Sequence, residues 1–411
     1  MMEAATQLDI KSIRSRFPVL NQEVNGKPLI YFDNAASSQT VDSVVKSVTH
    51  FYETDHANIH RGIHTLAERS TKAYEATREH VHRFINSAEA DEIVFTKGTT
   101  ESINLVAHSW GQVNLKEGDE IILSQFEHHS NIVPWQLIAE QKGARIKVIP
   151  VNEKGELIFE EYQKLLSDRT KMVSVNYISN SLGTVNPIEE IVRLAIQHGA
   201  ATMVDAAQAA PHVKLNVQEL NCDFLAFSSH KMYGPTGVGV LYGRRDALEA
   251  IPPYQGGGEM IKDVSFDGTS YNDIPYKFEA GTPNIGDVIA FDKAISFIEE
   301  LGHEVIQAHE QELLSYASEQ LSNIDGYIPY GTSEHKASVI SFLIEGIHQY
   351  DLGQLLDVKG IAVRTGHHCT QPLMDHFEID GTVRASFSVY NTKEEIDIFC
   401  KALKEIVKRF R

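Results

Sequence analysis

The sequence predicts an α/β protein with a large domain, built on a mostly parallel sheet flanked by helices, and a smaller α+β domain after it. The chain has 411 residues, which exceeds the usual size of a single hydrophobic core. Its hydrophobic fraction of 42% and charged fraction of 23% are ordinary for a globular protein. Between residues 92 and 242, short β-rich runs alternate with helix-length segments, which implies right-handed crossovers between parallel strands.

The alternation assigns each element of the large domain in turn. Predicted strands cover residues 93–96, 120–124, 144–150, 171–178, 201–207, 223–229 and 238–243. Predicted helices between them cover residues 99–110, 131–143, 159–166 and 187–199. Because the strand segments are nearly continuous apolar runs, we expect the sheet to be buried on both faces.

The remaining segments divide the chain further. Residues 254–286, rich in glycine, proline and aromatic residues, predict an irregular excursion that reaches a neighbouring subunit. After residue 287 a long helical pattern precedes the runs SVISFLI, LGQLLDVKGIAVR and RASFSVYN, which predict the small domain. We therefore expect an N-terminal arm over residues 1–28 packing with the small domain, a large domain over 29–286 and a small domain over 287–411.

The charge balance and the apolar runs restrict the partners and the compartment. Lys and Arg number 37 against 56 Asp and Glu, a formal net charge of -19, which argues against nucleic acid and anionic membrane as partners. The first twenty residues lack the pattern of a signal peptide, and no later run has the length of a membrane helix. The sequence predicts a cytoplasmic protein.

The three cysteines differ in their surroundings. They form no CxxC pair, so neither a disulfide framework nor a zinc ribbon is indicated. Cys222 and Cys400 lie beside or within apolar runs, whereas Cys369 follows a predicted strand in a polar loop and is the best candidate nucleophile. A metal site with the preceding His367 and His368 is the alternative, but adjacent side chains project in different directions, and we expect no metal.

Polar residues follow several predicted strands, where ligands bind in open α/β sheets. They are Thr99, Thr100, Glu127, His128, Asn180, Asp205, His230 and Lys231. A partly desolvated lysine at Lys231 can lose its proton and form a Schiff base with a carbonyl cofactor, although most lysines are surface charges. Asp205 suits a protonated pyridine nitrogen, or else caps the segment that follows it.

The segment GTTES suits a phosphate group. Thr99 and Thr100 offer hydroxyls and backbone N–H groups at a helix N-terminus, and Ser228 and His230 are further donors. An ordinary capping role for the threonines is the alternative. Gln208 is a candidate donor to the phenolic oxygen of a cofactor, or a surface glutamine.

Two further features suggest ligand contacts. The pair His128-His129 allows stacking on a flat cofactor, metal binding or helix capping, and we favour stacking because companion ligands at a metal-site spacing are missing nearby. Arg384 is suited to a bidentate grip on a substrate carboxylate, with Arg364 as a second candidate. Either arginine serves equally well as a structural ion-pair partner.

Taken together, these motifs resemble a known family. The motifs are GTTE, EHHSNIVPW, SNSLGT, VDAAQ, SSHKMYGPTG, FEAGTP and RTGHHCTQP. They resemble the class-V aminotransferases within fold type I of the enzymes that use pyridoxal 5′-phosphate (PLP). More narrowly, they resemble the SUF-type, group II cysteine desulfurases, also described as selenocysteine lyases. The resemblance runs from FDNAAS to RASFSVYN, nearly the whole chain.

The resemblance implies a role for each site residue. Lys231 would carry PLP covalently, with Asp205 on the pyridine nitrogen, Gln208 on the phenolic oxygen and His128 stacked on the ring. Thr99, Thr100, Ser228 and His230 would hold the phosphate, together with Thr282 from a partner subunit, which implies a homodimer. The substrate-binding set would comprise Asn180, Arg364, Arg384, His60 and Arg61.

The resemblance also implies the reaction. L-Cysteine would become L-alanine while Cys369 takes the sulfur as a persulfide and passes it to an acceptor protein of the SUF pathway for iron-sulfur cluster assembly. L-Selenocysteine is a further expected substrate, and a selenocysteine lyase or a cysteine-sulfinate desulfinase of the same fold is the alternative enzyme. A sulfur-relay or metal-binding module is the non-enzyme alternative. Thr370 stands where many relatives carry alanine. Tyr350 stands where some relatives that pass sulfur to a zinc-bearing scaffold carry histidine, which leaves the identity of the acceptor open.

Overall fold

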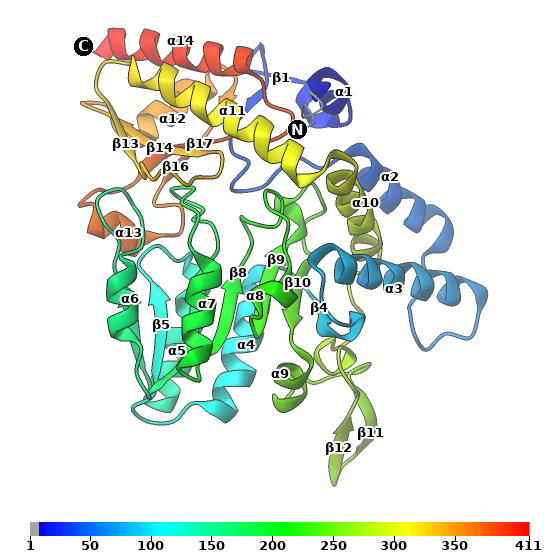
Figure 1. Ribbon diagram of the computed structural model, residues 1–411. Coiled ribbons are helices and arrows are strands. Elements are labelled where there is room, and N and C mark those ends of the chain that lie inside the picture. The colour runs from blue at the N-terminus through cyan, green and yellow to red at the C-terminus, as the bar shows by residue number, and fades with distance from the viewer. Residues whose placement is uncertain (1–7, 411) are drawn as a thin grey trace, which may run out of the picture.

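The computed structural model describes residues 8–410 and is built around a sheet of seven strands (Figure 1). The strands lie in the order β4 (Ile93–Thr96), β10 (Gly239–Gly243), β9 (Phe224–Ser228), β8 (Ala201–Asp205), β7 (Thr170–Asn176), β5 (Glu120–Ser124) and β6 (Arg145–Ile149). Only β10 runs antiparallel to its neighbours in this sheet, and the pairs from β9 to β6 are parallel. The predicted α/β class with a mostly parallel sheet is confirmed.

Helices cover both faces of this sheet because its strands alternate apolar side chains to both sides. Along β9, Phe224 and Ala226 join the core that contains Trp135, while Leu225 and Phe227 join the core on the other face. The helices that follow the strands are α4 (Thr99–Asn114), α5 (Val133–Lys142), α6 (Phe159–Leu165), α7 (Ile188–Gln197), α8 (Val217–Leu220) and α9 (Arg245–Ala250). Each crossover returns the chain to the same edge, so the strand ends that carry the polar residues lie together.

A second, antiparallel sheet lies above the first in Figure 1. Its strands are β13 (Tyr327–Tyr330), β14 (Val339–Ile344), β17 (Thr382–Ser386) and β16 (Arg364–Gly366). The helices packed around it are α11 (His303–Ser322), α12 (Gln349–Asp357) and α14 (Lys393–Phe410), and the short α13 (Gln371–His376) joins β16 to β17.

Two segments pack across the boundaries expected from the sequence. Strand β3 (Ile30–Tyr31) pairs in parallel with β15 (Ile361–Ala362), so that Ile30 belongs to the core of the smaller part. Helix α10 (Ile285–Leu301) packs against α2 (Asp42–His50) and α3 (Thr65–Ile85), so that its buried Phe291 belongs to the core of the larger part. The division of the chain into domains stays a prediction.

The N-terminal segment contacts the C-terminal end of the chain. The first seven residues of the expected arm lie outside the described residues, and α1 (Ile10–Ser15) and the short pair β1 (Glu23–Val24) and β2 (Lys27–Pro28) follow. Arg14 donates to the Tyr390 carbonyl at 2.8 Å and pairs with Glu395 at 2.7 Å. These contacts tie the segment to α14 and the loop before it.

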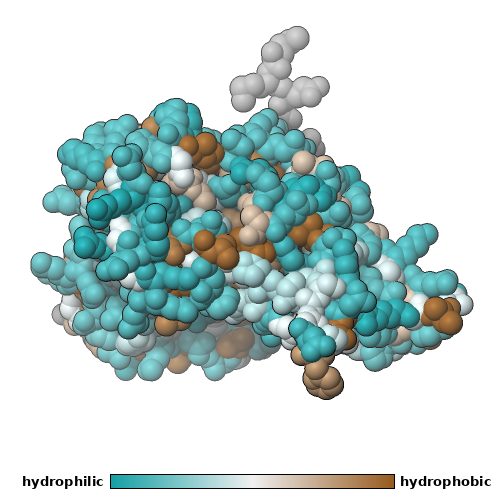
Figure 2. Space-filling view, turned by 90° about the horizontal axis from the view of Figure 1, so that it is seen from below, coloured by the Kyte–Doolittle hydropathy of each residue, from teal (hydrophilic) through white to brown (hydrophobic). Residues whose placement is uncertain are grey.

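The expected excursion contains a hairpin that projects from the body of the molecule (Figure 1). Its strands are β11 (Ile261–Ser265) and β12 (Gly268–Tyr271), and Val264 and Phe266 are exposed on it. The face shown in Figure 2 is mostly hydrophilic, with apolar residues only in small groups. Contact between this hairpin and a neighbouring subunit stays a prediction. Within residues 8–410, the structure contains no helix with the length and apolarity needed to span a membrane.

Candidate active site

A cavity of about 330 Å³ lies at the carboxyl ends of the central strands, below the small sheet. Its lining comes from strand ends, from the start of α4 and from the loops around β16 and β17. The lining residues are Ala35, Ala36, Thr99, Thr100, His128, Ser130, Asn180, Asp205, Ala207, Ser228, His230, Lys231, Arg364, His368, Cys369 and Arg384. Most of the residues that the sequence marks as site candidates therefore meet in one place.

Lys231 and Asp205 form the charged pair of the cavity. Lys231 lies in the turn after β9, and burial lowers the pKa of its amine while the charge of Asp205 opposes that shift. Asp205 ends β8, and burial raises the pKa of its carboxyl against the effect of Lys231. The carboxylate also accepts a hydrogen bond from the Ala207 N–H at 2.9 Å. Asp205 therefore both caps the following turn and lines the cavity.

The N-terminus of α4 supplies hydrogen-bond donors to one end of the cavity. Gly239 lies against Gly98, where a Cβ atom on Gly239 would stand 2.4 Å from the Gly98 Cα, so only glycine permits this close approach. The approach brings the Thr99 N–H to 2.8 Å from Ser228 Oγ and the Thr99 hydroxyl to the same distance from it. Thr99 is the first residue of the helix rather than its cap, which is Gly98. Hydroxyls, N–H groups and the helix dipole thus converge at a point that suits an anion.

His128 forms a wall of the cavity and also caps the turn that follows. Its Nδ1 accepts from the Ser130 N–H at 3.1 Å, and burial lowers the pKa of the ring to about 3. Glu127 is fully buried beside it and accepts from the Asn131 side chain at 2.8 Å and the Asn176 N–H at 3.0 Å. Burial raises the pKa of Glu127 to about 7. The neutral imidazole ring of His128 is therefore held in one orientation.

Cys369 lies on a loop with an unusual backbone between β16 and α13. His368 and Cys369 have φ angles of 53° and 57°, the left-handed region that residues other than glycine rarely adopt. The His368 carbonyl accepts from the Asn180 side chain at 2.8 Å, and the Cys369 carbonyl accepts from the His129 N–H at 2.7 Å. The Cys369 side chain is exposed and also lines the cavity.

The other two cysteines are poor nucleophiles by comparison. Cys222 and Cys400 are both buried. Burial raises the pKa of the Cys222 thiol strongly and that of Cys400 to about 11, so the reactive thiolate is disfavoured at both. Cys369 is the exposed cysteine of the three, and its role as the nucleophile stays a prediction.

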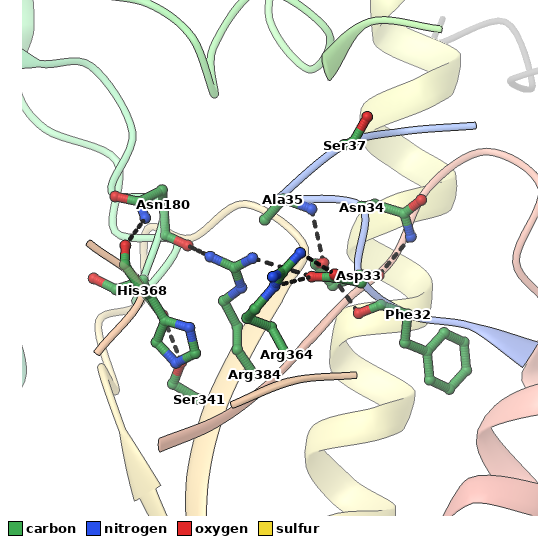
Figure 3. A network of polar contacts seen from close by, with 12 residues as sticks. Phe32, Asp33, Asn34, Ala35, Ser37, Asn180, Ser341, Arg364, His368 and Arg384 are labelled. Atoms are coloured by element: carbon green, nitrogen blue, oxygen red, sulfur yellow. Dashed lines mark hydrogen bonds and ion pairs between the residues drawn. The ribbon is translucent and has the colours of Figure 1, made fainter. Parts of the chain in front are cut away.

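Two arginines share one carboxylate beside the cavity (Figure 3). Arg384 is buried, donates to the Asn180 carbonyl at 2.8 Å and lies 3.3 Å from Asp33 Oδ1. Arg364 is half-exposed and donates to Asp33 Oδ2 at 2.6 Å. Arg384 Nε is buried and has no hydrogen-bond partner within residues 8–410. The arginines are thus ion-pair partners, and Arg384 retains a free donor for a ligand.

Four expected site residues lie outside this cavity in the described chain. Gln208 donates to the Ala35 carbonyl at 2.6 Å, so its amide is engaged next to the cavity. Thr282 lines a separate cavity. His60 pairs with Glu75 of α3 at 2.8 Å, and Arg61 pairs with Glu259 at 3.0 Å. The roles expected for these four residues stay predictions.

The structure also adds residues that the sequence did not single out. Asp33, Ala35 and Ala36 come from the segment after β3, and Ser130 follows the two histidines. The stretch FDNAAS marks the start of the family resemblance, which was the one available signal for Asp33. Across residues 8–410, no three His, Cys, Asp or Glu side chains gather as a metal-binding group.

Comparison with known proteins places the chain in a family. The model of the class-V aminotransferases matches residues 30–399. The chain belongs to the class-V aminotransferase family. A cysteine desulfurase of Synechococcus elongatus is 49% identical over 98% of the chain, and the chain spans 64% of that protein, less than two thirds of its length. This class-V aminotransferase is also 47% identical to a probable cysteine desulfurase of Halalkalibacterium halodurans over 98% of the chain and 99% of the relative.

A solved structure gives the same picture. The apo structure of a cysteine desulfurase from Thermococcus onnurineus NA1 superimposes with a TM-score of 0.93 and 40% sequence identity, covering 99% of this chain and 100% of that chain. The architecture of this class-V aminotransferase is therefore that of solved cysteine desulfurases along its whole described length.

Proposed function

We propose that the chain is a PLP-dependent cysteine desulfurase that converts L-cysteine to L-alanine and keeps the sulfur as a persulfide on Cys369. The observation that carries this proposal is that Lys231, in the turn after β9, and Cys369, in the loop after β16, line one cavity. The family and the cysteine desulfurases among its relatives support it.

The chemistry of the cavity fits PLP. Lys231 has an amine whose pKa is lowered by burial, as a Schiff-base lysine needs. The N-terminus of α4 and Ser228 suit the phosphate, Asp205 suits the pyridine nitrogen and His128 suits the ring face. When bound, PLP supplies an electron sink for charge that develops at the substrate Cα.

The chain's own residues orient the substrate and move its proton. Arg384, through its free buried Nε, and Arg364 hold the α-carboxylate of L-cysteine beside Asn180. The neutral amine of Lys231 removes the proton at the substrate Cα and returns one as alanine forms. Burial of the amine favours the neutral form that this proton transfer requires.

Cys369 receives the sulfur. Its thiolate attacks the substrate Sγ, the new S–S bond forms and the substrate Cβ–S bond breaks, with protons returned to the carbon product. Cysteine and one enzyme thiol thus give alanine and one enzyme persulfide, so atoms and electrons balance without an added oxidant. The exposed side chain of Cys369 is then accessible to an acceptor protein of the SUF pathway, which uses the sulfur for iron-sulfur cluster assembly.

The proposal includes a homodimer and a cytoplasmic location. Thr282, His60 and Arg61 lie away from the cavity of their own chain, and a second subunit would bring them to it. Gln208, next to Ala35, would contact the cofactor's phenolic oxygen. Free thiols at all three cysteines suit a reducing compartment.

Mass spectrometry after treatment with L-cysteine tests the proposed function. The PLP-loaded protein should gain one sulfur atom on the peptide that contains Cys369 and release alanine. Cys369→Ser should abolish both, whereas Cys400→Ser, which removes a buried thiol, should leave both unchanged. Unaltered alanine release by Cys369→Ser would remove the persulfide mechanism, and release from selenocysteine alone would favour a selenocysteine lyase.

A further inference from the structure

The proposed reaction gives a role to His128 of the EHH motif but none to the next residue, His129. Its neighbour His128 faces the cavity, whereas His129 contacts the loop that carries Cys369. We propose that His129 is a positioning residue that clamps the Cys369 loop over the cavity. The consequence for sulfur transfer rests on the proposed function, but the clamp itself does not.

The clamp consists of two hydrogen bonds from one residue to two points on the loop. The His129 N–H donates to the Cys369 carbonyl at 2.7 Å, and His129 Nε2 accepts from the Gln371 N–H at 3.1 Å. A main-chain N–H only donates, so Nε2 must carry a free lone pair, which requires a neutral ring. Burial, and then the neighbouring His367, lower the pKa of His129, which favours that neutral state.

The loop needs such a clamp because of its backbone. His368 and Cys369 both adopt the left-handed conformation, which for non-glycine residues persists only when surrounding contacts hold it. Gln371 is the first residue of α13, so its N–H has no acceptor within the helix. The imidazole of His129 therefore satisfies a free helix-end donor and fixes the end of the strained segment.

Other contacts hold the loop at His368. The Asn180 side chain donates to the His368 carbonyl at 2.8 Å, and His368 Nε2 lies 2.8 Å from Thr382 Oγ1. The contacts with Asn180 and Thr382 fix His368, whereas His129 fixes Cys369 and Gln371. Since His128 and His129 are adjacent, a single turn sets both the wall of the cavity and the position of the thiol above it.

Hydrogen exchange of the loop amides in PLP-loaded protein tests the clamp without turnover. In His129→Phe the ring remains but the acceptor is lost, and the Gln371 amide should exchange roughly fivefold faster, the effect of one neutral hydrogen bond. In His129→Gln the side-chain oxygen offers an acceptor, and exchange should stay within about twofold of the wild type. The control His376→Gln alters an exposed histidine of α13 and should change nothing.

Two outcomes would overturn the clamp. The first is unchanged exchange of the Gln371 amide in His129→Phe. The second is exchange of this amide that is as fast in His129→Gln as in His129→Phe. Should the phenylalanine variant not fold, His129→Ala gives the same readout. A fall of kcat/KM for cysteine by a similar factor in His129→Phe, with the absorbance of the cofactor unchanged, would also support the clamp. Absence of persulfide in the wild-type protein would reject the proposed function alone, since exchange does not depend on it.

Discussion

Arg384 on β17 lies 3.3 Å from Asp33, a residue that precedes it by most of the length of the chain. The same carboxylate accepts from Arg364 on β16 at 2.6 Å (Figure 3). Asp33 therefore ties the segment after β3 to two strands of the small sheet and balances two cations beside the cavity. Asp33 thus contacts both guanidinium groups, and the Asn180 carbonyl holds Arg384 as well.

Asp33→Asn should destabilise the folded protein. The amide keeps the shape of the side chain but removes its charge, so the buried Arg384 loses its counter-charge. We expect the free energy of unfolding to fall by about 2 kcal/mol, less than for a fully buried pair because Arg364 is half-exposed. Denaturant unfolding measures the effect, with the exposed pair partner Asp246→Asn as the control. A loss no larger than that of the control would mean that the shared carboxylate contributes little.

Arg384→Lys should weaken substrate binding more than it slows the reaction. Lysine keeps the positive charge but lacks the planar set of donors, including the buried Nε that is free for a carboxylate. We expect KM for L-cysteine to rise roughly tenfold or more, the range for a lost charge-assisted hydrogen bond, while kcat changes less. Steady-state kinetics measures both values. Arg244→Lys, which alters a surface ion pair with Asp246, is the matched control, and an unchanged KM in Arg384→Lys would assign the carboxylate to another residue.

Lys231→Ala should separate cofactor attachment from sulfur transfer. Borohydride treatment of the PLP-loaded wild type should fix the cofactor to the peptide that contains Lys231, because only a Schiff base is reducible in this way. The variant should lose this covalent label, whereas Cys369→Ser should keep it. Mass spectrometry of the treated peptides gives the result. A label retained in Lys231→Ala would move the attachment to another amine.

The large sheet and its polar edge were predictable because local patterns encode them. Strands such as β9 are continuous apolar runs, and Lys231 follows directly on the chain, so the sequence predicts its place at the sheet edge. Cys369 could be singled out as the candidate nucleophile because its neighbours are polar, in contrast to those of Cys400, and this role stays a prediction. The class-V aminotransferase resemblance, which rests on such local motifs, is confirmed by the family match.

Contacts between distant segments were not predictable in this way. The parallel pairing of β3 with β15 brings Asp33 to the arginines. Neither strand is long enough to show a periodic pattern from which this pairing could be predicted. The clamp by His129 also joins distant segments, because Gln371, which donates to His129, lies 242 residues further along the chain. The role expected for Thr282 involves a second subunit, and the substrate-binding roles expected for His60 and Arg61 likewise stay predictions.

His80 should make stability depend on pH in a defined direction. This histidine of α3 bridges two carboxylates of α10, with Nδ1 2.6 Å from Asp292 and Nε2 2.8 Å from Glu299. The hydrogen bond to Asp292, against burial and with help from Glu299, raises the pKa of His80. A raised folded-state pKa means that the stabilisation by protonated His80 is complete below the unfolded pKa of about 6.5 and is lost as pH rises through the folded pKa.

His80→Gln should therefore reduce the free energy of unfolding by about 1 kcal/mol more at pH 6 than at pH 9. Denaturant unfolding at both pH values measures this, with His82→Gln, whose ring contacts Ser87 Oγ at 2.8 Å, as the control on the same helix. Equal losses at the two pH values would show that His80 packs between the helices without acting as a cation.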